Sequence, residues 1–158
     1  MTIQWHGDEN FNLKTKINQV QIGQKIKLGE LEITSPGEYE VGGTQIEVID
    51  GIIGVFAEGM SIGHMKKGRV LSDEDLEKLN GIDILLIGVG GGEFTENKTA
   101  LEVINQIEPS LVIPMHNGNV GDFAKEEGIN SEGQDELKIS KAELPADARQ
   151  VVVLNAHR

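Results

Sequence analysis

Apolar and polar residues alternate along much of the first half of the chain. Phe11 and Leu13 mark one face of a segment whose other face carries Lys14 and Lys16, and the same alternation returns over residues 25–28 and 30–33. A period of two is typical of a strand with one buried face. Glycine and proline separate these segments at intervals that suit hairpins. The first half is therefore predicted to be an antiparallel meander of short strands.

The second half of the chain changes to a helical period. Ser72 precedes three acidic residues, a pattern typical of a capped helix start. Residues 84–87 are continuously apolar, as in a strand covered on both faces, and residues 111–113 repeat this pattern. Between them, apolar residues fall at the i, i+3, i+4 and i+7 positions of one helix face: Ala100, Val103, Ile104 and Ile107. This order predicts a βαβ crossover with parallel strands.

The C-terminal residues continue the alternation of helices and strands. They predict a short helix near 122–127, a strand around 137–139 and a strong terminal strand at 151–154. No repeat, low-complexity tract or long linker divides the sequence, and 158 residues suit one compact domain. Residues 1–158 are therefore expected to form a single domain of the α/β (α+β) class.

Composition excludes several chemistries. The chain has no cysteine, which rules out disulfides, thiolate metal sites and a cysteine nucleophile. Its 26 acidic and 14 basic residues give a net charge of -12, so nucleic-acid binding is not expected. No apolar run approaches the roughly 20 residues of a membrane span, and residues 1–9 lack the features of a secretion signal. A cytoplasmic protein that does not bind membranes is expected.

Four segments, taken together, resemble one protein family. They are residues 3–11 with Trp5, residues 36–43 (Pro-Gly-Glu-Tyr-Glu-Val-Gly-Gly), residues 71–91 with their Gly-rich end, and residues 105–116 ending in Ile-Pro-Met-His. In this order they are similar to the lactonase-like branch of the metallo-β-lactamase fold superfamily, Zn-dependent hydrolases related to L-ascorbate-6-phosphate lactonase. The resemblance implies a metallo-β-lactamase-like αββα sandwich with the metal site at one edge, between the sheets. Its N-terminal half is expected to be reduced.

Most of the metal ligands that the resemblance implies are missing from this sequence. The family carries His-x-His-x-Asp-His after its early strands, because clustered imidazoles and a carboxylate hold two metal ions that activate water. The chain has no such motif, and the stretch from Gly23 to Thr34 lacks the loop and helix that bear it. A lysine, Lys66 or Lys67, stands at or beside the position of the metal-bridging Asp. No catalytic residue and no resident metal are therefore expected.

Two groups of residues are candidates for a vestigial site at that edge. Four of them could supply metal ligands or hydrogen bonds: His116, His64, Asp8 and His6. The resemblance matches His116 to the family's last metal-binding histidine. Three neighbouring cations could instead hold a carboxylate or a phosphate: Lys66, Lys67 and Arg69.

Three functions are compatible with these residues. The first is a degenerate, non-catalytic pseudoenzyme, without a cofactor, that acts through self-association or partner binding. The second is a metal-dependent hydrolase with a reduced Zn site around His64 and His116. The third is an anion-binding module that uses the vestigial cleft. Because the missing loop and helix would uncover apolar sheet surface, a homodimer or a docked protein partner is expected.

Overall fold

Two β-sheets pack face to face in the computed structural model, which describes residues 1–79, 81–116, 120–127 and 133–157. The first sheet has six strands in the order β13-β1-β2-β3-β4-β5, with antiparallel neighbours throughout. Its strands are β1 (Thr2–Trp5), β2 (Phe11–Lys14), β3 (Gln19–Ile22), β4 (Ile26–Leu28), β5 (Leu31–Ile33) and β13 (Leu137–Lys138). The antiparallel meander predicted from the period-two pattern is confirmed.

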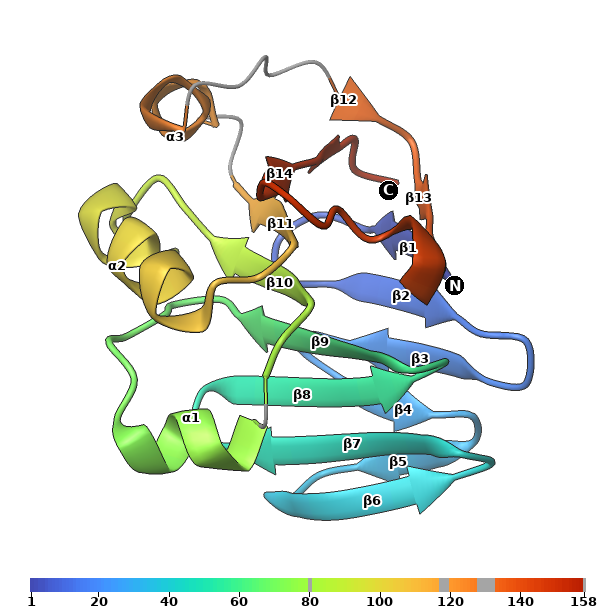
Figure 1. Ribbon diagram of the computed structural model, residues 1–158. Helices are drawn as coiled ribbons and strands as arrows, with labels where there is room; N and C mark the ends of the chain where they lie inside the picture. The colour runs from blue at the N-terminus through green and yellow to red at the C-terminus, as the bar shows by residue number, and fades with distance from the viewer. Residues whose placement is uncertain (80, 117–119, 128–132, 158) are drawn as a thin grey trace.

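The second sheet has seven strands in the order β14-β11-β10-β9-β8-β7-β6. Its strands are β6 (Gly37–Val41), β7 (Thr44–Ile49), β8 (Ile52–Ala57), β9 (Met60–Met65), β10 (Ile84–Gly88), β11 (Leu111–Met115) and β14 (Gln150–Val151). Strands β6 to β9 continue the meander, whereas β9, β10, β11 and β14 run parallel. The predicted βαβ crossover is therefore confirmed, with α2 (Asn97–Ile107) between β10 and β11 (Figure 1).

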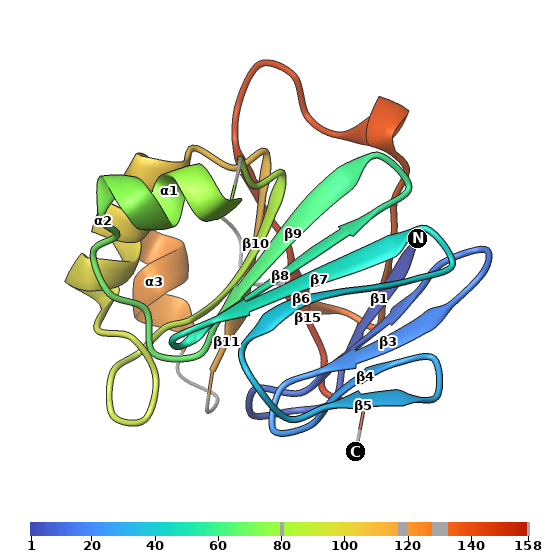
Figure 2. The same ribbon diagram turned by 90° about the horizontal axis from the view of Figure 1, so that it is seen from below.

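The described α-helices lie together on the outer face of the second sheet (Figure 2). Besides α2 they are α1 (Asp73–Leu79) and α3 (Gly121–Glu126). A 3₁₀ turn, η1 (Lys141–Glu143), lies apart from them at the margin of the sheet. One apolar core fills the space between the sheets, and a second core joins the second sheet to the helices. None of the helices in the described ranges has the length and apolar character that crossing a membrane requires.

The layer arrangement agrees with the metallo-β-lactamase-like sandwich that the sequence predicts. Sheet, sheet and helical layer follow one another, and none of the described helices covers the outer face of the first sheet. Helix α1 begins where the capping pattern places it, with the Asp75 amide donating to Ser72 Oγ at 3.1 Å. The terminal segment differs from the prediction of one strong strand. It splits into β14, which extends the second sheet, and β15 (Val153–Leu154), which pairs with β12 (Gly133–Gln134).

The outer face of the first sheet is polar, contrary to the expectation that the missing loop and helix leave an apolar surface. The alternating residues of β1 to β5 turn these side chains away from the core: Thr2, Gln4, Asn12, Lys14, Gln19, Gln21, Lys27 and Glu32. That expectation is wrong because the same alternation that buries one face makes the other hydrophilic. Self-association stays a prediction, but it loses this argument.

Candidate functional site

The residues predicted to form a vestigial site come from three places in the fold. Asp8 lies in the turn between β1 and β2, His64 lies on β9, and His116 follows the last residue of β11. The turn belongs to the first sheet, whereas β9 and β11 belong to the second. The site is therefore built by packing the two sheets together.

His64 is buried between the sheets and is held by the turn of the first sheet. Its ring is 3% exposed and meets the ring of Phe11 edge-on, with 6.0 Å between centroids. Nε2 donates to the carbonyl oxygen of Glu9 at 2.7 Å. Burial lowers the pKa of the imidazole, and the interaction with Glu9 offsets only part of that shift. His64 is therefore a neutral side chain whose Nε2 carries the proton.

This buried imidazole predicts a pH dependence of stability. The pKa of this histidine is lower in the folded state than in the unfolded state, where it is about 6.5. Below that pH the unfolded state binds a proton more readily than the folded state does, so acid destabilises the fold. The free energy of unfolding should therefore decrease as the pH falls from about 7.5 to about 5.5, by at most about 1.4 kcal/mol per pH unit for each such histidine. Urea titrations at several pH values measure this slope. A His64→Gln variant should show a shallower slope, and an equal slope would contradict the prediction.

Glu9 is the residue at this edge that sequence reasoning missed. Its carbonyl oxygen holds His64, and its carboxylate lies 3.1 Å from Lys66 Nζ. The ammonium of Lys66 also sits 5.9 Å from the ring centroid of Phe94. One residue of the turn between β1 and β2 thus contacts His64 on β9 and Lys66 just after β9. No local pattern marks Glu9, because both contacts span more than fifty positions of sequence.

His116 lies at the same edge but packs in a different environment. Its ring centroid is 4.8 Å from that of Trp5, which in turn lies 6.4 Å from that of Phe11. Burial lowers the pKa of His116 as well. The rings of His64, Phe11, Trp5 and His116 therefore form a continuous row, in which the two aromatic residues of the first sheet lie between the two histidines.

The side chains of Asp8 and His6 do not point toward His64 and His116. Asp8 has an exposed side chain, and it is the carbonyl oxygen of Asp8 that contacts the site, by accepting from Trp5 Nε1 at 3.0 Å. His6 is exposed, and its Nδ1 lies 2.9 Å from the carbonyl oxygen of His157. The hypothesis that these two side chains converge with His64 and His116 has no support in this geometry.

The side chains at this edge do not fit a zinc centre. A zinc ion needs lone pairs from about three protein nitrogen or oxygen atoms. His64 offers only Nδ1, because Nε2 donates its proton to Glu9, and the ammonium of Lys66 would repel a dication. Within the described ranges, no group of three or more His, Cys, Asp or Glu side chains is arranged to hold a metal ion.

The three cations proposed to hold an anion point to three different partners. Lys66 pairs with Glu9, and Lys67 Nζ donates to the carbonyl oxygen of Gly92 at 2.9 Å. Arg69 Nη1 donates to Asp75 at 2.6 Å, and this hydrogen bond lowers the pKa of the Asp75 carboxyl to about 2. The structure therefore does not bring these cations together as one anion site.

Comparison with known proteins identifies relatives over most of the chain. The model of the beta-lactamase superfamily domain matches residues 3–116. A UPF0173 protein of Pyrococcus furiosus is 25% identical over 115 residues, which are 72% of this chain and 51% of the relative. A UPF0173 protein of Pyrococcus abyssi is 27% identical over 114 residues, which are 68% of this chain and 48% of the relative. The chain thus spans about half the length of these two relatives.

Solved structures share the fold over a larger part of the chain. A proposed Zn-dependent hydrolase of the metallo-beta-lactamase superfamily from Thermotoga maritima has a TM-score of 0.84 at 24% identity and covers 98% of this chain and 100% of its own. Igni18, a metallo hydrolase from the archaeon Ignicoccus hospitalis, has a TM-score of 0.65 at 10% identity, covering 88% and 99% respectively. The fold is thus that of metallo-β-lactamases. The Thermotoga maritima protein shares this fold over nearly the whole length of both chains.

Proposed function

This chain belongs to the beta-lactamase superfamily domain family, and from that premise we propose that it uses a hydrolase-like fold for binding rather than for metal-dependent hydrolysis. One observation carries the proposal. Glu9 engages both His64 and Lys66 at the edge where the resemblance implies the metal centre. The ammonium of Lys66 cannot act as a metal ligand, and His64 offers only its Nδ1 atom, because Nε2 carries the proton that it donates to Glu9.

The family's chemistry depends on metal ions that polarise the substrate and generate hydroxide from bound water. In this chain the corresponding edge supplies a fixed positive charge from Lys66, which already neutralises the carboxylate of Glu9. A dication placed beside this pair would compete with the ammonium for Glu9 and would face its repulsion. The edge is therefore suited to joining the two sheets.

A second function, metal-dependent hydrolysis at a reduced site around His64 and His116, is favoured by the comparisons. The names of both solved neighbours describe hydrolases, one Zn-dependent and one a metallo hydrolase, and neither name describes a non-catalytic protein. For this function His64 would bind the metal through Nδ1, which its Nε2–H donation to Glu9 allows, and Lys66 would have to leave the edge. The two functions thus make opposite predictions about metal.

Metal analysis separates them. Protein purified without chelator should contain far less than one zinc per chain, and its thermal midpoint should be the same with EDTA and with excess zinc, because a ligand that binds only the folded state raises that midpoint. Differential scanning fluorimetry and elemental analysis measure both quantities. Stoichiometric zinc that disappears in His116→Gln, together with ester or lactone hydrolysis, would refute the proposal and establish the second function.

A further inference from the structure

The outer face of β6 to β9 carries two rows of residues that run across the strands. The strand register aligns Glu38, Glu47, Gly54 and Gly63 in one row, and Glu40, Gln45, Phe56 and Ser61 in the other. The two glycines let the helical layer approach the sheet closely. Leu79 packs on Gly54, and Ile82 packs on Gly63 so tightly that a Cβ there would overlap it.

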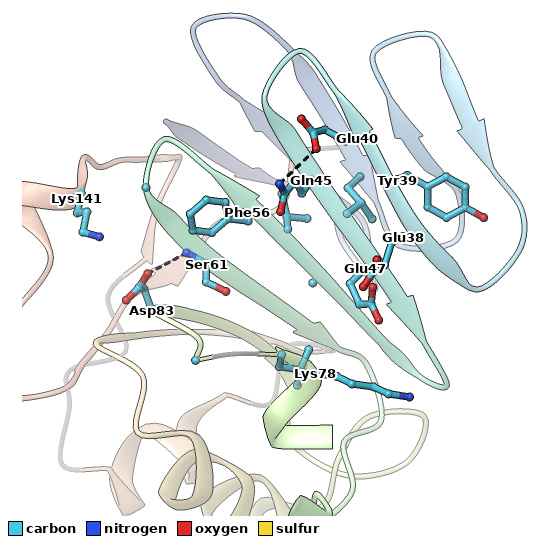
Figure 3. A pocket seen from close by; sticks show the side chains of 16 residues that line it. Glu38, Tyr39, Glu40, Gln45, Glu47, Phe56, Ser61, Lys78, Asp83 and Lys141 are labelled. Atoms are coloured by element: carbon cyan, nitrogen blue, oxygen red, sulfur yellow. Dashed lines mark hydrogen bonds between the residues drawn. The ribbon is translucent and has the colours of Figure 1, made fainter. Parts of the chain in front are cut away.

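The helical layer leaves the rest of these rows uncovered. A groove of about 610 Å³ lies on this part of the sheet, between the end of α1 and the 3₁₀ turn η1. Figure 3 shows Phe56 on its floor, Glu38 and Glu47 side by side at one end, and Lys141 on the opposite side. Phe56 is 48% exposed, which makes it an accessible apolar contact point on the floor of the groove.

The charges in the groove are unbalanced. Glu38 and Glu47 lie directly opposite each other on β6 and β7, an arrangement of like charges that costs stability. Partial burial and the charge of Glu38 raise the pKa of Glu47. The nearby Lys78 forms its ion pair with Glu74 at 3.4 Å, and among the described residues no ion pair joins Glu38, Glu40 or Glu47 to a cation. A positive charge from outside the chain would relieve this repulsion.

We propose that this groove binds an extended basic segment of a partner protein. A lysine or arginine of the segment would lie on the Glu38–Glu47 pair, and an apolar side chain would lie on Phe56. Glu38 and Glu40 are two residues apart on β6, so both face the groove, and an extended segment lying in the groove would direct alternate side chains toward these carboxylates and toward Phe56. A second copy of this chain suits the groove poorly, because each copy carries a net charge of -12.

This docking surface goes beyond the proposed function. The groove lies on the outer face of the second sheet, whereas His64 faces the core between the sheets. The result of the peptide-binding test is therefore independent of the metal analysis, whichever function that analysis supports.

A binding experiment with defined peptides tests the proposal. The probe is a fluorescein-labelled peptide of alternating lysine and valine, measured by fluorescence anisotropy at about 0.1 M salt, where long-range attraction is largely screened. In Glu38→Gln/Glu47→Gln the dissociation constant should rise about tenfold, the loss of roughly 1.4 kcal/mol expected when charged contacts are removed. Phe56→Ser should also weaken binding. The double variant relieves a repulsion, so it should fold at least as well as the wild type.

The control variant is Glu32→Gln/Glu102→Gln, which makes the same change in net charge at two exposed carboxylates outside the groove. It should leave the dissociation constant within about twofold of the wild-type value. Equal weakening in both double variants would show attraction to net charge alone and would overturn the proposal. The absence of measurable binding would also overturn the proposal. So would equal binding of a control peptide that has the same composition but carries its lysines in one block.

Discussion

Replacing Trp5 with alanine is expected to lower the free energy of unfolding by about 3–5 kcal/mol, the range for truncating a buried aromatic side chain. Trp5 is 3% exposed and packs between the rings of Phe11 and His116. Its indole also donates to the carbonyl oxygen of Asp8. Truncation therefore leaves a cavity at the sheet edge and removes the partner of that carbonyl. Urea titration followed by far-UV circular dichroism measures the loss, since the variant lacks the chain's single tryptophan.

A Trp5→Phe variant separates packing from hydrogen bonding. Phenylalanine keeps most of the apolar volume but has no indole N–H, so we expect about 1–2 kcal/mol of destabilisation. If Trp5→Ala cost less than Trp5→Phe, or less than about 1 kcal/mol, Trp5 would not be a structural anchor of the candidate site.

Changing Gly88 to alanine is expected to cost about 3 kcal/mol, at the upper end of the range for overpacking a core. Gly88 ends β10, and a Cβ there would overlap the carbonyl oxygen of Lys66 and lie 2.7 Å from the ring of Phe94. Because the main obstacle is backbone, it cannot rotate away. The ends of β9 and β10 would have to separate, which would disturb the contact between Lys66 and Glu9. Thermal and urea unfolding measure the effect.

Gly54→Ala is the matched control for this substitution. Gly54 is also a strand glycine without a positive φ, but a Cβ there would lie 3.5 Å from Leu79, an ordinary contact distance. We expect a change of less than about 0.5 kcal/mol, because strand glycines without crowding tolerate alanine. Equal losses in the two variants would show that the close approach at Gly88 is unimportant.

Local patterns were sufficient to predict most of the secondary structure. The alternation around Phe11 and Leu13 is a direct consequence of strand geometry, and it needs no knowledge of neighbouring strands. The same holds for the Ser72 cap and for the apolar face of α2. The terminal strand was predicted less well, because its residues are apolar throughout and pattern alone does not show that β14 and β15 pair with different strands.

The candidate site was predicted only in part. His64 and His116 do lie at one edge, as the resemblance implied, but the contacts that define their chemistry come from Glu9 and Trp5. Glu9 is one of many acidic residues in the sequence, and nothing adjacent to it indicates a role. The convergence of Lys66, Lys67 and Arg69 failed for a related reason, since each cation found a nearer partner in the folded chain.

The order of side chains along the chain is sufficient to predict which face of each strand is buried and where the principal helices begin. These properties depend on the order of neighbouring side chains, and that order is explicit in the sequence. The folded structure was needed to show that Glu9 contacts His64 and Lys66, that Gly88 has no room for a Cβ atom, and that the Glu38–Glu47 pair borders a groove with Phe56 exposed on its floor. These features arise when segments distant in the chain pack together, and their energies depend on distances that no local pattern contains.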